Sequence, residues 1–212
     1  MRNEALAVRF GRFFGSPLAE WLAKLPFKIN PNIITLSSLI PGFLAGFCFL
    51  SNQLLLGVLF FILSFILDCT DGEFARITNQ VTDFGKKLDF RVDVIRIGFM
   101  YFGLWYSQYY LHGIWFIGGS ILFLHYCVMV FGYMFIEYEL LFSSSFTSHD
   151  EGLITFMFLP LFCIFYDGAF QVGLPILILL QFFSYLSLFI RQKNKPNMLL
   201  NVKKSLKLVK DE

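Results

Sequence analysis

Charged residues are scarce in this sequence, and positive charge is missing from a long part of it. Only 15% of the 212 residues are Asp, Glu, Lys or Arg, whereas soluble domains carry about 25%. No Lys or Arg occurs from residue 97 to residue 190, and none of the four cysteines forms a C-x-x-C pair. We therefore expect neither a disordered chain nor an ordinary soluble globule, no nucleic-acid partner, and no disulfide or metal framework built on cysteine.

Apolar residues take the place of the missing charge. They make up 57% of the chain, which contains 29 Phe. Because a hydrocarbon core of about 30 Å needs about 20 helical residues, the apolar runs predict an all-α membrane protein with six transmembrane helices. The predicted spans are 33–50, 54–67, 94–110, 113–136, 151–166 and 172–190. The second span is short, and we expect its helix to continue through the polar stretch that follows.

The two ends of the chain differ from these spans. Residues 1–28 mix apolar side chains with five Lys and Arg, which predicts an amphipathic interfacial helix on the membrane surface, broken near Gly15–Pro17. Residues 191–212 hold seven Lys and Arg and predict a basic cytoplasmic tail suited to anionic lipid headgroups. We expect these parts to belong to one membrane domain over residues 1–212.

The positions of Lys and Arg predict the orientation in the membrane. Besides the two basic ends, the remaining five of the 17 lie between Arg76 and Arg96. With six spans, all three groups lie on one side. The turns predicted on the other side, which hold no Lys or Arg, are 51–53, 111–112 and 167–171. The positive-inside rule therefore predicts a multi-pass protein, of the inner membrane in a prokaryotic cell, with both termini and the 68–93 stretch in the cytoplasm.

Four aspartates in the 68–93 stretch are the main candidates for a functional site. Asp68 and Asp71 share a helix face, and Asp89 and Asp93 share a face of the next helix. Two antiparallel helices joined by the 77–84 loop would gather the four carboxylates at the membrane surface, where cations must neutralise them. All-oxygen ligands favour Mg²⁺, Mn²⁺ or Ca²⁺, and a metal pair would suit phosphoryl or pyrophosphate transfer. The alternative is a set of interfacial charges that only cap helices.

These residues resemble a family signature. The string D-x2-D-G-x2-A-R-x8-G-x3-D-x3-D, from Asp68 to Asp93, is similar at every fixed position to that of the CDP-alcohol phosphatidyltransferase family. The resemblance implies a six-helix membrane enzyme with an amphipathic N-terminal helix, usually a homodimer. It also implies transfer of a phospho-alcohol unit, with CDP-diacylglycerol as the expected donor, to an acceptor hydroxyl in phospholipid biosynthesis, with release of CMP.

The resemblance assigns roles to the aspartates. It implies that Asp68, Asp71 and Asp89 are ligands of two divalent cations, Mg²⁺ or Mn²⁺, and that Asp93 is both a ligand and the general base. The metals would offset charge on the diphosphate and stabilise the leaving CMP. Asp93 would take the proton from the acceptor hydroxyl as it attacks the β-phosphate.

Further residues are implied to bind the nucleotide. Gly72 and Ala75 would line the cytidine pocket, Arg76 would contact the nucleotide, and Gly85 would permit a close approach of helices. The stretch that begins at Pro31 also resembles the P-N-x-x-T pattern that the family has before its first span. It implies that Asn32 and Thr35 help to hold the nucleotide. The alternative is that Asn32 and Thr35 are simple N-terminal caps.

The acceptor is expected to carry no phosphate of its own. Family members that use phosphorylated acceptors resemble one another in having basic residues in the later spans, and this chain has none there. Apart from the tail, the cations that could hold an acceptor phosphate are Lys86, Lys87, Arg91 and Arg96. The loop after the fourth predicted span is acidic, and it either attracts a cationic amino alcohol or is simply solvated. Its residues are Glu137, Glu139, His149, Asp150 and Glu151.

A different class of function is a membrane cation transporter that uses the aspartate cluster as its ion site. A transporter predicts acidic residues near the middle of its spans. The aspartates instead lie in the predicted cytoplasmic region, which favours the enzyme.

Overall fold

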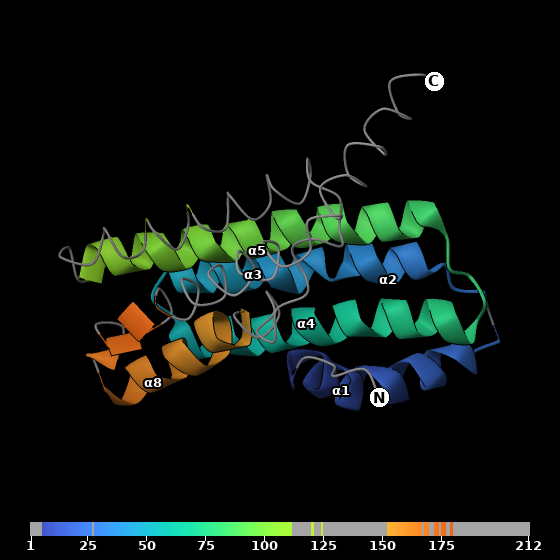
Figure 1. The fold of residues 1–212 in the computed structure, drawn as a ribbon, viewed down its shortest axis with the longest axis horizontal. Coiled ribbons are helices and arrows are strands. Elements are labelled where there is room, and N and C mark those ends of the chain that lie inside the picture. The colour runs from blue at the N-terminus through green and yellow to red at the C-terminus, as the bar shows by residue number, and fades with distance from the viewer. Residues whose placement is uncertain are drawn as a thin grey trace, which may run out of the picture.

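The regular elements in the described parts of the chain are all helical (Figure 1). The structure, a computed structural model, describes residues 6–26, 28–111 and 152–166, with isolated positions 120, 124, 168, 169, 172, 173, 175, 176 and 179. The elements are α1 (Leu6–Ala23), α2 (Pro31–Ser37), α3 (Leu39–Leu50), α4 (Leu54–Ile77), α5 (Asp83–Leu111), the π-helical turn η2 (Ile154–Phe158) and α8 (Leu159–Phe165). The predicted all-α class is confirmed for these residues.

Among the described residues, two helical segments are long and apolar enough to cross a membrane, Pro31–Leu50 and Leu54–Ile77. The second is α4, which continues through the polar stretch without a break, as expected. Its 24 residues make a helix of about 36 Å at about 1.5 Å per residue. This exceeds a hydrocarbon core of about 30 Å, so the last turns of α4 can project beyond it.

Of the other four predicted spans, 94–110 is described in full, 151–166 except for its first residue, and the remaining two only at isolated positions. Helix α5 begins at Asp83, eleven residues before the predicted span at 94–110, and has 29 residues. Within 151–166, the apolar helix Ile154–Phe165 has fewer than 18 residues. The spans 113–136 and 172–190 lie largely outside the described residues, and the basic tail and the acidic residues from Glu137 to Glu151 lie wholly outside them. Six transmembrane helices therefore stay a prediction.

The expected break near Gly15–Pro17 is wrong. Helix α1 runs from Leu6 to Ala23 with Pro17 inside it. Gly15 lies where α1 meets α4, since a Cβ at this position would lie 3.2 Å from the backbone nitrogen of Thr70. Gly and Pro weaken an isolated helix, but here the packing of α1 against α4 compensates for that weakness. Gly15 therefore serves contact between helices rather than a turn.

Helix α1 has one face against α4 and another that is exposed. Ala19 is fully buried and packs with Ile34 and Phe74. Phe13 and Trp21 are exposed by 73% and 58%. Figure 1 shows α1 beside the C-terminal half of α4, with α8 beside the other half. This two-sided character agrees with an amphipathic helix, whose position at a membrane surface stays a prediction.

A short interruption separates α2 from α3. Pro41 has no backbone N–H and therefore cannot donate to the carbonyl oxygen four residues earlier, at Ser37. The chain turns at Ser38, whose carbonyl oxygen accepts a hydrogen bond from Ser64 Oγ of α4 at 2.8 Å. The interruption thus gives α4 a polar contact at the point where α2 ends and α3 begins.

The main apolar core lies toward the end of the bundle where α3 turns into α4. Phe156 of η2 is fully buried there. Its ring centroid lies 4.7 Å from that of Tyr101, 5.5 Å from Phe61 and 6.1 Å from Phe49. Four elements, α3, α4, α5 and η2, therefore meet on one aromatic cluster, which leaves the opposite end of α4 and α5 for polar residues.

The contact between α3 and α5 depends on two glycines. A Cβ at Gly103 would lie 2.2 Å from the backbone oxygen of Gly46, and a Cβ at Gly46 would lie 2.4 Å from Phe99 Cδ1. The first contact is with backbone, which cannot rotate away as a side chain can. The two helices therefore approach closely only because both positions lack a side chain.

We predict that Gly103→Ala lowers the stability of the bundle by about 1–3 kcal/mol, because α3 and α5 must separate to admit the methyl group. The measurement is the thermal unfolding midpoint in detergent. Gly152→Ala is the matched control, since a Cβ at Gly152 meets no atom within 4 Å. Equal midpoints for Gly103→Ala and the wild type would contradict this prediction.

Candidate metal and phosphotransfer site

Three carboxylates meet between α4 and α5. Asp68, Asp89 and Asp93 each offer an oxygen atom, and these three atoms lie within 4.8 Å of one another. Helix α4 ends at Ile77 and α5 begins at Asp83, so the chain reverses direction in a short turn and the two helices run antiparallel (Figure 1). The spacing of the aspartates then places them on the facing sides of both helices.

Asp71 lies beside this group but not within it. Its side chain is buried, with 5% exposed, and its Oδ2 atom has no hydrogen-bond partner among the described residues. Asp68 and Asp89 act on it electrostatically, and the hydroxyl of Thr35 on α2 interacts with it. A buried carboxylate oxygen without a partner is costly, so Asp71 favours a cation at this place.

Arg96 is the buried cation of the site. It is only 3% exposed, and its Nη2 atom lies 3.0 Å from Asp68 Oδ1 and also pairs with Asp93. Its Nη1 atom donates to the backbone oxygen of Ser64 at 3.0 Å and to Ser64 Oγ at 3.2 Å. Removing one partner from a buried ion pair typically costs about 3–5 kcal/mol. Arg96 therefore holds Asp68 and Asp93 in place.

This role of Arg96 was not predicted from the sequence, where Arg96 was expected only as one of the cations that could hold an acceptor phosphate. Two signals were present. Arg96 follows Asp93 by three residues, the spacing of an ion pair on one helix face. It also precedes a long apolar run, where an unpaired cation would be costly.

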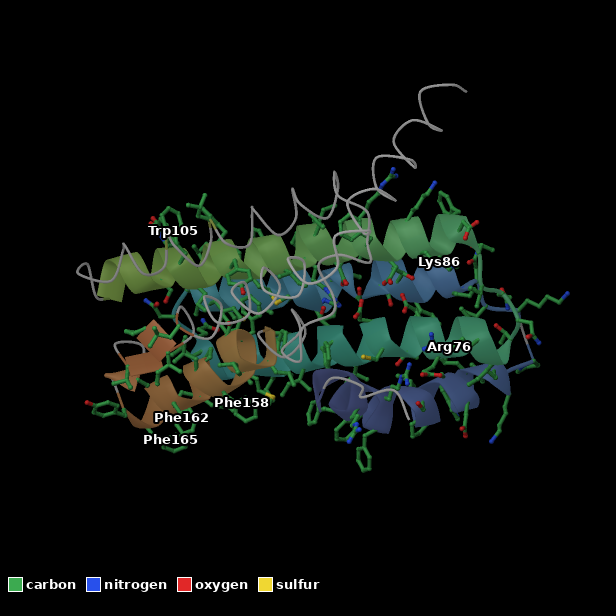
Figure 2. The ribbon with its side chains drawn as sticks, viewed as in Figure 1. Arg76, Lys86, Trp105, Phe158, Phe162 and Phe165 are labelled. Atoms are coloured by element: carbon green, nitrogen blue, oxygen red, sulfur yellow. The ribbon has the colours of Figure 1, made fainter. Side chains whose placement is uncertain are left out.

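The other cations considered for an acceptor phosphate lie elsewhere. Lys86 pairs with Asp83 at 3.1 Å, and both side chains are well exposed at the start of α5 (Figure 2). Lys87 and Arg91 are exposed. Since Arg96 is paired with aspartates, no buried Lys or Arg among the described residues is left beside the cluster to bind an acceptor phosphate.

Burial and the neighbouring negative charges make the ionised form of the clustered carboxylates costly. Burial, together with the negative charge of Asp68, raises the pKa of Asp89 to about 6, while Arg96 lowers it. One guanidinium among four carboxylates leaves an excess of negative charge. The donor atoms are all carboxylate oxygens, the ligand type that Mg²⁺ and Mn²⁺ prefer. The residues present therefore fit a divalent cation.

The residues implied to bind nucleotide lie on the next turns of α4. Gly72, Ala75 and Arg76 are partly or well exposed. Arg76 does not point freely into solvent, because its Nη2 atom lies 2.9 Å from Glu73 Oε1 (Figure 2). The same Glu73 oxygen lies 2.9 Å from Nε of Arg12 on α1. No role of Glu73 was predicted from the sequence, although its i,i+3 spacing to Arg76 permits this ion pair.

The N-terminus of α2 adds the last two predicted residues. Its cap is Asn30, whose side chain accepts from the backbone nitrogen of Asn32 at 3.0 Å. The reading of Asn32 and Thr35 as the caps is therefore wrong for this helix, since Thr35 bonds back to Pro31 within it. Asn32 Oδ1 would lie 3.3 Å from a Cβ at Gly85, so the start of α2 approaches the start of α5.

The described residues form a helical bundle that has two segments able to cross a membrane and an aspartate cluster between α4 and α5. These features are those of a helical membrane protein with a candidate metal site. The sequence model of the CDP-alcohol phosphatidyltransferase family matches residues 28–197. The chain belongs to this family, which confirms the resemblance, supports the expected transferase class and agrees with a membrane location. Helix α1 lies before the matched region.

Curated relatives agree with this membership. Over 73 residues the chain is 37% and 36% identical to the CDP-diacylglycerol–serine O-phosphatidyltransferases of two Helicobacter pylori strains, which is 34% of this chain. It is also 34% identical over 95 residues to an uncharacterised Aquifex aeolicus protein, covering 44% of this chain and 47% of that one. The matches span about a third of the two Helicobacter proteins, 31% of each.

We predict that Asp89→Asn weakens Mn²⁺ binding by on the order of 10–100-fold, the range found when groups that support a metal site are lost. The measurement is a Mn²⁺ titration followed by electron paramagnetic resonance. Asp83→Asn is the control, because Asp83 lies on the same helix but is exposed and pairs with Lys86. Equal Mn²⁺ affinities for Asp89→Asn and Asp83→Asn would contradict a site at this cluster.

Proposed function

We propose that this protein transfers a phosphatidyl group from CDP-diacylglycerol to the hydroxyl of a non-phosphorylated alcohol and releases CMP, in phospholipid biosynthesis. The observation that carries the proposal is the group of Asp68, Asp89 and Asp93 between α4 and α5, with oxygens within 4.8 Å, in a member of the family. A cation transporter is not favoured, because the family is one of phosphatidyltransferases.

Two divalent cations, Mg²⁺ or Mn²⁺, are proposed to be held by Asp68, Asp71, Asp89 and Asp93. When bound, they would offset the charge of the diphosphate and of the leaving CMP. The unpartnered Oδ2 of Asp71 and the surplus of carboxylates over Arg96 support this set.

Asp93 is proposed as the general base. The acceptor oxygen attacks the β-phosphorus, the bond from that phosphorus to the oxygen bridging the two phosphates breaks, and CMP leaves with that oxygen. The proton of the acceptor hydroxyl passes to Asp93. Arg96 supports this role because a paired guanidinium favours the ionised carboxylate that a base requires.

The nucleotide is proposed to bind beside the aspartates, over the small residues Gly72 and Ala75, with Arg76 in contact. Gly85 permits the approach of α2 to α5, and Asn32 and Thr35 are proposed to complete the pocket. The proximity of Asn32 to Gly85 and of Thr35 to Asp71 supports this arrangement.

Serine is the first acceptor to consider. Two relatives carry serine phosphatidyltransferase names, and no Lys or Arg occurs from residue 97 to residue 190 to bind an acceptor phosphate. Ethanolamine, choline and free polyols satisfy the same condition. The alternative direction, a CDP-linked headgroup donated to diacylglycerol, uses the same aspartates.

The surroundings of the site are proposed to follow the family pattern. The chain forms one membrane domain with six spans, an interfacial α1 and a basic tail, and both termini and the site lie in the cytoplasm. A homodimer is the proposed assembly. The support is the grouping of Lys and Arg in three segments and the two described helices able to cross a membrane.

We expect the purified protein to release CMP from CDP-diacylglycerol with one alcohol when Mg²⁺ or Mn²⁺ is present, and to stop when the metal is chelated. Serine, ethanolamine, choline, glycerol, inositol, glycerol phosphate and inositol phosphate are each tested alone, with CMP quantified by chromatography. Release with only a phosphorylated acceptor would overturn the acceptor assignment. If no CMP is released with any donor and acceptor, including a CDP-linked headgroup with diacylglycerol, the proposed transferase activity is overturned.

Asp93→Asn is expected to abolish turnover while leaving CDP-diacylglycerol binding measurable, because the amide cannot take the proton of the acceptor. Binding is followed by equilibrium dialysis of the donor. Asp83→Asn serves as the control for loss of one carboxylate from α5. Unimpaired turnover in Asp93→Asn would show that Asp93 is not the base.

A further inference from the structure

Glu73 connects two arginines from different helices. Its Oε1 atom lies 2.9 Å from Nε of Arg12 on α1 and 2.9 Å from Nη2 of Arg76 on α4, and its Oε2 atom accepts a longer bond from Arg76 Nε at 3.4 Å. The Glu73 side chain is only 18% exposed. One carboxylate thus ties α1 to the arginine proposed to contact the nucleotide.

The rest of α1 fixes this connection in space. Gly11 and Gly15 lie four residues apart, and a Cβ at either would lie within 3.3 Å of atoms of Cys69. Ala19, four residues further on, is fully buried. Because positions four apart share a helix face, this small-residue face presses α1 against the part of α4 that carries the aspartates. Arg12 is placed by that contact and is not a freely moving surface cation.

The guanidinium of Arg76 lies over Gly72. A Cβ at Gly72 would lie 3.4 Å from Arg76 Nη2 and 3.7 Å from Nη1. An arginine has many rotamers, and holding it in one place costs side-chain entropy unless partners constrain it. Glu73, itself held from the other side by Arg12, directs Arg76 to this position.

We propose that Arg12 and Glu73 are positioning residues for the donor, through which α1 becomes part of the site for a nucleoside diphosphate. Arg12 fixes the Glu73 carboxylate, and Glu73 holds the Arg76 guanidinium over Gly72, where the nucleotide binds. This rests on the proposed function, in which Arg76 contacts the nucleotide. Neither residue touches the reacting atoms, so their loss affects donor binding and leaves the chemical step unchanged.

The test measures KM and kcat for CDP-diacylglycerol, together with calorimetric binding of CMP in the presence of Mn²⁺. Arg12→Gln and Glu73→Gln are each expected to raise KM and weaken CMP binding about two- to fivefold, the size of effect that a partly exposed ion pair gives, with kcat unchanged. The double variant is expected to be no worse than Glu73→Gln, because both changes break one connection. Arg12→Lys, which keeps the charge, is expected to recover part of the loss.

Arg9→Gln is the matched control, since Arg9 is exposed on the same helix and its loss removes the same charge. It is expected to leave KM unchanged. The inference is overturned if Arg12→Gln leaves KM and CMP binding at the wild-type values, or if Arg9→Gln has the same effect. A fall in kcat and in the thermal midpoint without a change in CMP binding would also overturn it, because α1 would then only brace α4.

Failure of the proposed function gives a different result. A wild-type protein that releases no CMP with any donor and acceptor overturns the transferase reaction. CMP binding then still decides this inference, since weaker binding in Arg12→Gln supports it and unchanged or absent binding overturns it.

Discussion

The buried guanidinium of Arg96 is the constraint on which the site depends. It joins Asp68 and Ser64 on α4 to Asp93 on α5, and its stem passes Gly42 of α3, where a Cβ would lie 2.4 Å from Arg96 Cγ. A cation this deeply buried is costly unless its charge is paired. The three helices are therefore held at the separation that Arg96 permits, and the carboxylates take their places from it.

Residues without bulky side chains allow this arrangement. Gly42 admits Arg96, Gly103 admits the backbone of α3, and Gly15 admits the backbone of α4. At each of these glycines the missing side chain lets two helices approach closely, as is common between helices that pack without water. Near the aspartates, Gly15 lets α1 approach α4 and Gly42 makes room for Arg96 of α5. Packing and polar chemistry thus impose the same geometry.

Local patterns in the sequence predicted the helical class and a turn that brings aspartates of two helices together, and oxygens of Asp68, Asp89 and Asp93 lie within 4.8 Å of one another. Asp71, the fourth aspartate expected in that group, lies beside it. This prediction followed from i,i+3 and i,i+4 spacing and from a short turn between two long helices, and both features depend on near neighbours in the chain. The break at Gly15–Pro17 was wrong because the partner that stabilises α1 is some 55 residues away, at Cys69 and Thr70. The roles of Arg96 and Glu73 were missed for the same reason. Their partners Ser64, Asp68 and Arg12 lie on other helices, and residue spacing alone does not show which helices adjoin.

The unbroken course of α4 has a consequence for where a lipid reacts. Asp68 lies 14 residues after Leu54, about 21 Å along one rigid rod, so its level relative to the start of that helix cannot drift. On the proposed function, only the diphosphate of the donor has to reach the position of Asp68, and the fatty chains of the donor stay among the other lipids of the bilayer. Each methylene that remains there avoids a transfer into water of about 0.8 kcal/mol. An enzyme of this shape has no need to extract its substrate.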